Sequence, residues 1–167
     1  MKTLTEHLVQ YAAYHRDKRN IITHFIGIPM IVLAIAILLS RPMYWVEGLA
    51  LTPAWIMALG LGAFYLTLDL ALGLLMALLL ALCVWAGVQA AQEPTELWLS
   101  VGIGLFVLGW VIQFIGHYFE GKKPAFFDDI MGLAVGPIFV VAELIFMLGG
   151  LKRLRQQVEA KAGPIRN

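Results

Sequence analysis

Long apolar segments alternate with short polar breaks along the whole chain. The apolar segments cover residues 22–39, 51–68, 70–90, 97–116 and 130–149. A helix that crosses a bilayer needs roughly 20 apolar residues, and each segment is close to that length. The run 71–80 does not alternate between apolar and polar positions as a barrel strand does. The pattern therefore predicts an all-α fold, a polytopic transmembrane helical bundle of four to five spans.

The same pattern predicts one membrane domain over residues 1–167, because no polar stretch is long enough to form a second core. We expect residues 1–20 to be an interfacial segment with an amphipathic helix over 4–15, residues 21–150 to hold the membrane spans, and 151–167 to be a basic tail. The first twenty residues lack the uninterrupted apolar core of a secretory signal peptide, so we expect them to stay on the protein.

Basic residues set the expected orientation. Arg16, Lys18 and Arg19 mark a cytoplasmic flank, so the N-terminus is predicted to be cytoplasmic. If all five segments cross, the basic residues of 152–155 fall on the opposite side, against the positive-inside rule. We favour a version in which residues 130–149 re-enter or cross only partly, which leaves four spans and both termini inside.

The composition is typical of a membrane protein, and the charge limits the classes of partner that we expect. Hydrophobic residues make up 60% of the chain and charged residues 14%, with a mean hydropathy of +0.81. The 12 Lys+Arg and 11 Asp+Glu give a net charge of +1, so we expect the lipid bilayer and no nucleic acid as a partner. A homo-oligomer is left open. The single Cys83 cannot form an internal disulfide and is given no role.

Three of the four histidines are candidates for a shared site. His24 lies at the start of the first apolar segment and His117 at the end of the fourth, so both are expected at similar depth on one membrane side. His15 precedes the first segment and can fold over the same place. Ionisable groups at membrane depth are costly and usually functional. His7 is expected to be structural, because it lies on an exposed end.

A shared site requires a bend between His15 and His24. Nine residues separate them, which places them on opposite sides of one straight helix at roughly 100° per residue. Asn20 is a candidate helix N-cap at this point, with Arg16 and Asp17 available for a turn.

Gln113, His117 and Glu120 follow the spacing i, i+4, i+7, so they share one helix face within roughly 60°. Three interpretations of Glu120 stay open: a metal ligand, a partner that orients an imidazole, or an ion pair with Lys122 or Arg16. Neutral imidazoles with a carboxylate nearby suit Fe, Zn, Cu or Ni. Two histidines and one carboxylate are the pattern of non-haem Fe(II) oxygenases.

Other acidic residues have simpler interpretations. Asp128 and Asp129 are expected to cap the last apolar segment, with a ligand role as the alternative. Glu143 is expected to satisfy backbone groups freed by Pro137, or to lie behind the site.

The polar residues form two blocks, Tyr11-x3-His15-x4-Asn20-x3-His24-x2-Gly27-x-Pro29 and Gln113-Phe114-x-Gly116-His117-x2-Glu120-Gly121-x2-Pro124-Ala125-x2-Asp128. Together these blocks resemble the fungal 2-hydroxy fatty acid dioxygenase family, whose bacterial members are small multi-span membrane proteins. With the spans between them they cover nearly the whole chain.

The resemblance implies an Fe(II)-dependent enzyme that uses O2 to shorten a 2-hydroxy fatty acid by one carbon. It also implies that His15, His24 and His117 are the iron ligands, and it makes Asn20, Gln113 and Glu120 site residues of unassigned role. The family's membrane would be the endoplasmic reticulum in a fungus and the inner membrane in a bacterium. Arg16, Lys122 or Lys123 could hold the substrate carboxylate, but interfacial basic residues more often anchor helices.

A small transporter, or a lipid-binding membrane protein without redox chemistry, is the alternative. A transporter would need polar groups along a path through the bilayer. The middle of each apolar segment is nearly all Leu, Ala, Gly and Val, with polar residues toward one side, which argues against a path.

Overall fold

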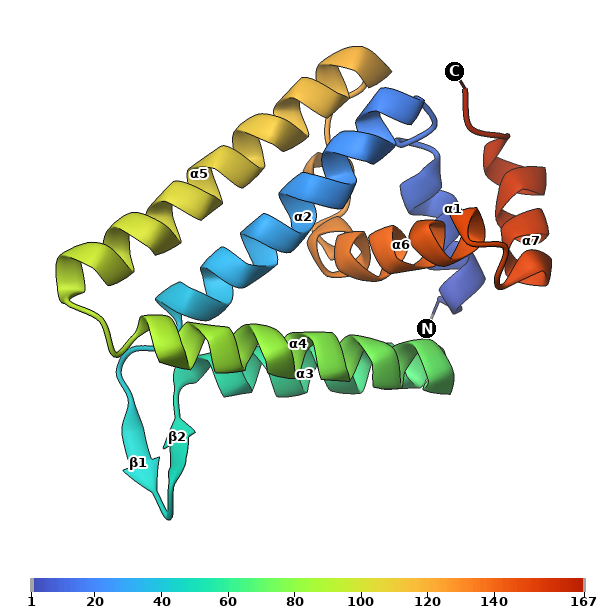
Figure 1. Ribbon diagram of the computed structural model, residues 1–167. Helices are drawn as coiled ribbons and strands as arrows, with labels where there is room; N and C mark the ends of the chain where they lie inside the picture. The colour runs from blue at the N-terminus through green and yellow to red at the C-terminus, as the bar shows by residue number, and fades with distance from the viewer. Residues whose placement is uncertain (1, 167) are drawn as a thin grey trace. The chain divides into compact units, whose positions relative to one another are not determined.

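The computed structural model describes residues 2–166 and is almost entirely helical (Figure 1). Its elements are α1 (Leu4–Ala12), α2 (Lys18–Leu38), β1 (Tyr44–Val46), β2 (Leu49–Leu51), α3 (Pro53–Leu68), α4 (Leu70–Ala90), α5 (Thr95–Glu120), the 3-10 helix η1 (Ala125–Phe127), α6 (Met131–Met147) and α7 (Lys152–Ala162). The predicted all-α class is confirmed. The antiparallel hairpin of β1 and β2 was not predicted.

Three helices in the described part of the chain are long and apolar enough to cross a membrane: α2, α4 and α5. Helix α3 is apolar but has only 16 residues. Helices α6 and α7 pass the same test only as a pair, and a bend of 112° separates them. The chain is a membrane protein whose described residues hold three candidate spans, or four if the bent pair counts as one. The four spans that we favoured from the sequence include residues 51–68, whereas α3 in this range is shorter than a span, so the two sets coincide only at α2, α4 and α5.

The chain consists of two compact units. One unit joins the N-terminal residues up to Ile28 with those from Val111 onward, and the other is Pro29–Trp110. Both boundaries fall inside helices, α2 and α5. The expectation of a single membrane domain stays a prediction, and each unit is described by itself.

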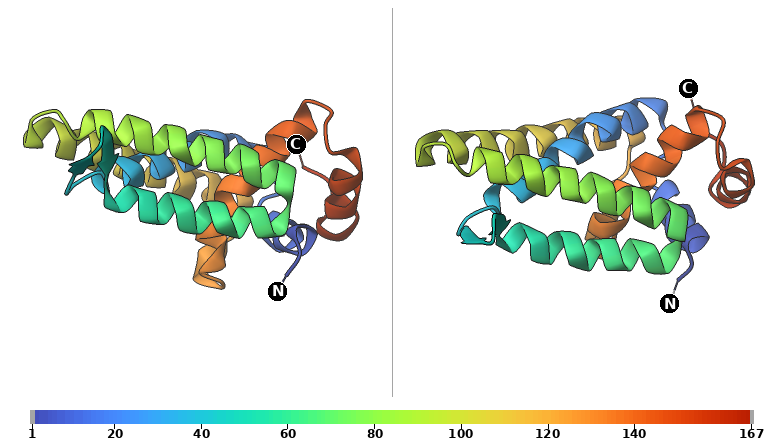
Figure 2. Two further views of the ribbon diagram at one scale, coloured as in Figure 1. Left: turned by 90° about the horizontal axis from the view of Figure 1, so that it is seen from below. Right: turned by 60° about the horizontal axis from the view of Figure 1, so that its bottom comes forward.

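The unit Pro29–Trp110 is built on the pair α3 and α4, which lie side by side in both views of Figure 2. Gly73 permits this pairing near the turn, because a Cβ there would lie 2.7 Å from the backbone of Leu66. Arg41 donates to the Ala91 carbonyl at 2.8 Å and lies over the Trp98 ring. None of the candidate site residues belongs to this unit.

The other unit holds all the candidate site residues. Helix α1 begins with a capping box between Thr3 and Glu6 and packs its apolar face against α6 and α7. Leu8 is 1% exposed at this contact, and the Tyr11 ring packs on Phe139. The expected amphipathic helix over 4–15 therefore exists but ends at Ala12. Its position at a membrane interface stays a prediction.

The bend between α1 and α2 lies in residues 13–17, earlier than expected. Helix α2 begins at Lys18, so Asn20 is inside its first turn and the prediction that Asn20 caps the helix is wrong. The side chain of Asp17 performs this role, since it accepts the Arg19 backbone N–H at 2.8 Å. At the start of α6 the N-cap residue is Ile130, so the predicted capping by Asp128 and Asp129 is wrong, although Asp129, one residue earlier, accepts the Met131 N–H at 3.0 Å.

Candidate functional site

His15, His24 and His117 come together in the interior of the protein. Their exposed fractions are 0%, 2% and 6%. The ring centroids of His15 and His24 are 4.4 Å apart, and that of His117 is 4.9 and 5.0 Å from these two. One nitrogen from each ring lies within 4.8 Å of the other two, which is close enough for a single metal ion to bind all three. We call these residues the three-histidine cluster.

The chain path explains why residues distant in sequence meet here. His15 lies in the turn after α1, and His24 lies two turns into α2. The turn therefore supplies the bend that a straight helix would lack. His117 is in the last turn of α5, near its end at Glu120. Gly116 allows α5 to approach α2, because a Cβ there would lie 2.0 Å from the Thr23 Oγ1 and 2.5 Å from the Asn20 Oδ1.

Backbone carbonyls orient two of the imidazoles. The Nδ1–H of His15 donates to the Tyr11 carbonyl at 2.6 Å, and that of His24 donates to the Asn20 carbonyl at 2.8 Å. Because a carbonyl only accepts, the proton is assigned to Nδ1 in both rings, which leaves Nε2 with its lone pair. This is the usual arrangement of a metal-binding histidine, whose second nitrogen is held by an outer hydrogen bond.

Several buried polar atoms of this region have no hydrogen-bond partner. Within the described residues, these atoms include His15 Nε2, His117 Nδ1, Asn20 Oδ1 and Gln113 Nε2. An unpartnered buried polar atom is costly and rare in a folded protein. Four such atoms, on the cluster and the helical turns beside it, indicate a place for a polar ligand.

The environment of His15 favours the neutral imidazole. Burial lowers the pKa of His15 well below its ordinary value, and the neighbouring His24 lowers it further. The Tyr11 ring stacks on the His15 ring, with centroids 4.1 Å apart and planes within 5°. A neutral, immobilised imidazole is the form that binds a metal ion.

Glu120 holds the turn between α1 and α2. One of its carboxylate oxygens accepts the backbone N–H groups of Arg16 at 2.9 Å and Asp17 at 2.7 Å, and the Asn20 side chain at 3.2 Å. The other oxygen accepts from the guanidinium of Arg166. Of the three interpretations of Glu120, the ion pair is present, but its partner is Arg166 and not Lys122 or Arg16. Glu120 connects the end of α5 to the turn that carries His15.

The basic residues considered for a substrate carboxylate already have partners. The Arg16 guanidinium donates to Glu143 at 2.7 Å, and both side chains are buried. Glu143 thus neutralises a buried cation. Lys122 donates to the Ala13 carbonyl and Lys123 to Asp128. These contacts agree with structural roles.

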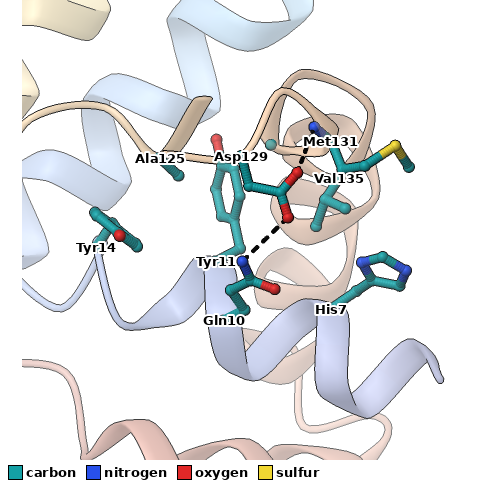
Figure 3. Close-up of a pocket in the computed structure, with 9 residues that line it drawn as sticks. His7, Gln10, Tyr11, Tyr14, Ala125, Asp129, Met131 and Val135 are labelled. Atoms are coloured by element: carbon teal, nitrogen blue, oxygen red, sulfur yellow. Dashed lines mark hydrogen bonds between the residues drawn. The ribbon is translucent and has the colours of Figure 1, made fainter. Parts of the chain in front are cut away.

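A small pocket lies beside the three-histidine cluster (Figure 3). Tyr11, whose ring stacks on His15, forms part of its lining. Its lining consists of His7, Gln10, Tyr11, Tyr14, Ala125, Asp129, Met131, Gly132 and Val135. His7 was expected on an exposed end, but only 8% of it is exposed. The structure does not bring His7 into the three-histidine cluster.

Sequence reasoning did not identify two residues near the cluster. Tyr11 belongs to a recognised motif, but its spacing did not predict a ring stacked on His15. Arg166 lies in the polar tail, 46 residues from its partner Glu120, and nothing local in the sequence indicates this contact.

Three buried histidines, one in the turn after α1 and two on candidate membrane-spanning helices, define a membrane protein with a candidate metal centre. Comparison with known proteins identifies the family. The family model described as Mpo1-like, 2-hydroxy-palmitic acid dioxygenase Mpo1-like, matches residues 1–148, and the chain belongs to this family. It is 32% identical over 151 residues to the 2-hydroxy-palmitic acid dioxygenase MPO1 of Saccharomyces cerevisiae, across 89% of this chain and 83% of that protein. No solved structure matches the chain significantly.

Proposed function

We propose that the chain is an Fe(II)-dependent dioxygenase that acts on 2-hydroxy fatty acids and shortens them by one carbon with O2. The observation that carries the proposal is the three-histidine cluster, found in a chain whose family and yeast relative are named as 2-hydroxy-palmitic acid dioxygenases. His15, His24 and His117 are the proposed ligands. Asn20, Gln113 and Glu120 support the site and the substrate.

The residues present fit an iron ion. Neutral imidazoles suit Fe(II), and the unpartnered nitrogens of His15 and His117 are available as ligand atoms. The three nitrogens occupy part of a coordination sphere, which leaves room for substrate and O2 atoms. When bound, the ion supplies Lewis acidity and one-electron redox chemistry toward O2.

The protein's own residues position the ligands and select the substrate. The carbonyls of Tyr11 and Asn20 hold two imidazoles, and burial excludes bulk water from the cluster. In the proposed complex the unpartnered Oδ1 of Asn20 accepts from the substrate 2-hydroxyl, and the unpartnered Nε2 of Gln113 donates to the substrate carboxylate. The acyl tail stays in the bilayer, beside the apolar helices.

Metal content is the first test. Wild-type protein, purified in mild detergent without chelators, is expected to hold iron near one ion per chain by mass spectrometry. His117→Ala removes a ligand and is expected to lose the iron. His7→Ala is the matched control, because His7 is a buried histidine of the same unit outside the cluster. Wild-type protein that takes up no metal, even after anaerobic addition of Fe(II), would contradict the proposal.

Activity is the second test. With 2-hydroxypalmitic acid labelled at the carboxyl carbon, we expect O2-dependent formation of a fatty acid one carbon shorter that has lost the label. The product should be absent without O2 and absent with His117→Ala. Solute movement across liposomes by the metal-free protein, without lipid oxidation, would instead favour the transporter, and lipid retention without either would favour a lipid-binding protein.

A further inference from the structure

The last described residues, Gly163–Arg166, lie against the turn between α1 and α2. We call them the C-terminal strap. The Arg166 backbone N–H donates to the Arg16 carbonyl at 2.7 Å, and the Lys18 N–H donates to the Arg166 carbonyl at 3.0 Å. These two bonds form a parallel bridge between Arg166 and Asp17. The Arg16 side chain adds a third contact, to the Gly163 carbonyl at 3.2 Å.

The side chain of Arg166 reaches Glu120. The carboxylate of Glu120 has no exposed area, while the Arg166 side chain is 60% exposed. Glu120 uses one oxygen to hold the backbone of Arg16 and Asp17, and gives the other to Arg166. The same strap residue therefore contacts the turn through its backbone and the group that fixes the turn through its side chain.

This double contact bears directly on the three-histidine cluster. His15 immediately precedes Arg16 in the turn, and His24 is in the helix that begins at Lys18. Glu120 is one helical turn beyond His117. Any movement of the turn relative to the end of α5 would therefore change the spacing between His117 and the other two rings. Burial of polar groups without partners is unfavourable, so loss of Arg166 would leave one oxygen of a buried carboxylate unpaired.

We propose that the C-terminal strap is a positioning element of the metal site and that Arg166 is its positioning residue. It rests on the proposed function, because it assumes that the cluster binds iron. The strap lies beyond residues 1–148, the part that matches the family model. Its role thus concerns a segment outside the matched family region.

Metal binding and strap closure must favour each other equally. If the closed strap increases the affinity of the cluster for metal, metal must increase the stability of the closed strap by the same factor, since the two equilibria are linked. This reciprocity provides a measurement that needs no enzymatic turnover. The backbone N–H of Lys18 bonds to the strap, so its hydrogen exchange reports strap opening directly.

The experiment compares three variants in detergent. Arg166→Ala and Arg166→Lys are made in the full-length protein, and the third variant is a truncated chain that ends at Ala162. Arg153→Ala is the matched control, because Arg153 is an exposed tail arginine in α7, outside the strap. The Fe(II) dissociation constant is measured anaerobically by competition with a chromogenic chelator. Residues that hold the metal ligands in place without binding the metal themselves typically contribute about tenfold or more to metal affinity.

We expect affinity to fall about tenfold in Arg166→Ala and further in the truncated chain, which also loses the backbone bonds. Arg166→Lys keeps a cation for Glu120 and should recover part of the affinity, whereas Arg153→Ala should match the wild type. In metal-free protein, exchange at the Lys18 amide should be faster in the truncated chain, and bound metal should slow it in the wild type.

Two different failures can be distinguished. Wild-type iron affinity retained in both Arg166→Ala and the truncated chain would overturn the strap proposal and leave the proposed function standing. A wild-type protein that binds no iron would remove the proposed function and, with it, the strap's role toward metal. Unchanged exchange at Lys18 after truncation would overturn the strap contact itself, whichever result the metal assay gives.

Discussion

At the scale of single residues, the site depends on groups that act through the histidines. Tyr11 contributes twice to His15, because its carbonyl accepts the ring N–H and its own ring stacks on the imidazole. The carbonyl would survive any substitution, while the stacking would not. Stacked rings contribute more to the stability of the fold than the burial of their apolar area alone would give.

Tyr11→Ala is therefore expected to destabilise the protein by about 3–5 kcal/mol, the usual cost of truncating a large buried aromatic side chain. It should also weaken metal binding, because His15 loses its neighbour. Tyr11→Phe keeps the ring and should retain most of both properties. Thermal unfolding in detergent and a metal titration measure the two effects. Equal losses in Phe and Ala variants would show that the hydroxyl, rather than the ring, is responsible.

The sequence was sufficient to predict that the three histidines share a site, because each lies near an end of an apolar segment. His24 begins one span and His117 ends another, so their depth follows from helix geometry. Arg166 could not be found in this way. It follows a polar helix in a tail without apolar periodicity, and its contact with Glu120 depends on the path of the whole chain. Asn20 was expected at a helix end, but capping by Asp17 moved that end to Lys18.

At the scale of elements, the contact between α2 and α5 depends on Gly116. A Cβ at this position would overlap Thr23 Oγ1 and Asn20 Oδ1. Thr23 cannot move freely, because its hydroxyl donates to the Asn20 carbonyl at 2.7 Å. That carbonyl also holds His24. The packing of α2 against α5 and the orientation of the His24 ring therefore both depend on Asn20 and Thr23.

Gly116→Ala is expected to separate the helices and destabilise the protein by about 1–3 kcal/mol, as overpacking usually does. Gly104→Ala is the matched control in the same helix, because a Cβ there meets nothing within 4 Å. The control should unfold at the wild-type temperature or above it, since Ala favours helix over Gly. Comparison of the two unfolding midpoints, with metal affinity, tests the contact. Equal midpoints for both variants would contradict it.

The loop between α5 and α6 is tied to the turn after α1 by Asp128. Lys123 donates to this carboxylate, and the Tyr14 hydroxyl donates to it at 2.8 Å. The hydrogen bonds from Lys123 and then Tyr14 lower the pKa of Asp128. A carboxyl whose pKa is lowered on folding stabilises the folded state above its unfolded pKa, and this stabilisation is lost as the pH falls through the folded pKa.

We therefore expect wild-type protein to unfold at a higher temperature than Asp128→Asn at pH 7, and the difference to shrink below about pH 4. Thermal unfolding at pH 7, 5 and 3 measures it. Glu47→Gln is a suitable control, because it removes an acidic charge in the β1–β2 hairpin, which belongs to the other compact unit. A difference that grows as the pH falls would have the wrong sign for a lowered pKa.

At the scale of the whole molecule, the C-terminal strap indicates on which side of the membrane the two termini lie. If every apolar segment crossed, the basic tail would lie opposite the N-terminus. The structure pairs Arg166 with Arg16 and Lys18 through backbone hydrogen bonds, so the tail returns to the start of α2. The bend of 112° between α6 and α7 is the place where the chain turns back. These contacts favour the version with both termini on one side, and the cytoplasmic side remains a prediction from charge.

Single cysteines labelled by a membrane-impermeant maleimide test this orientation in intact cells. The background is Cys83→Ala, so that the introduced cysteine is the only thiol in the protein. Thr5→Cys and Ala160→Cys should both be protected until the membrane is opened. Glu93→Cys precedes α5, whose far end carries His117, so it should be labelled from outside. Labelling of Ala160→Cys from outside would place the tail across the membrane from α2, which is incompatible with the strap.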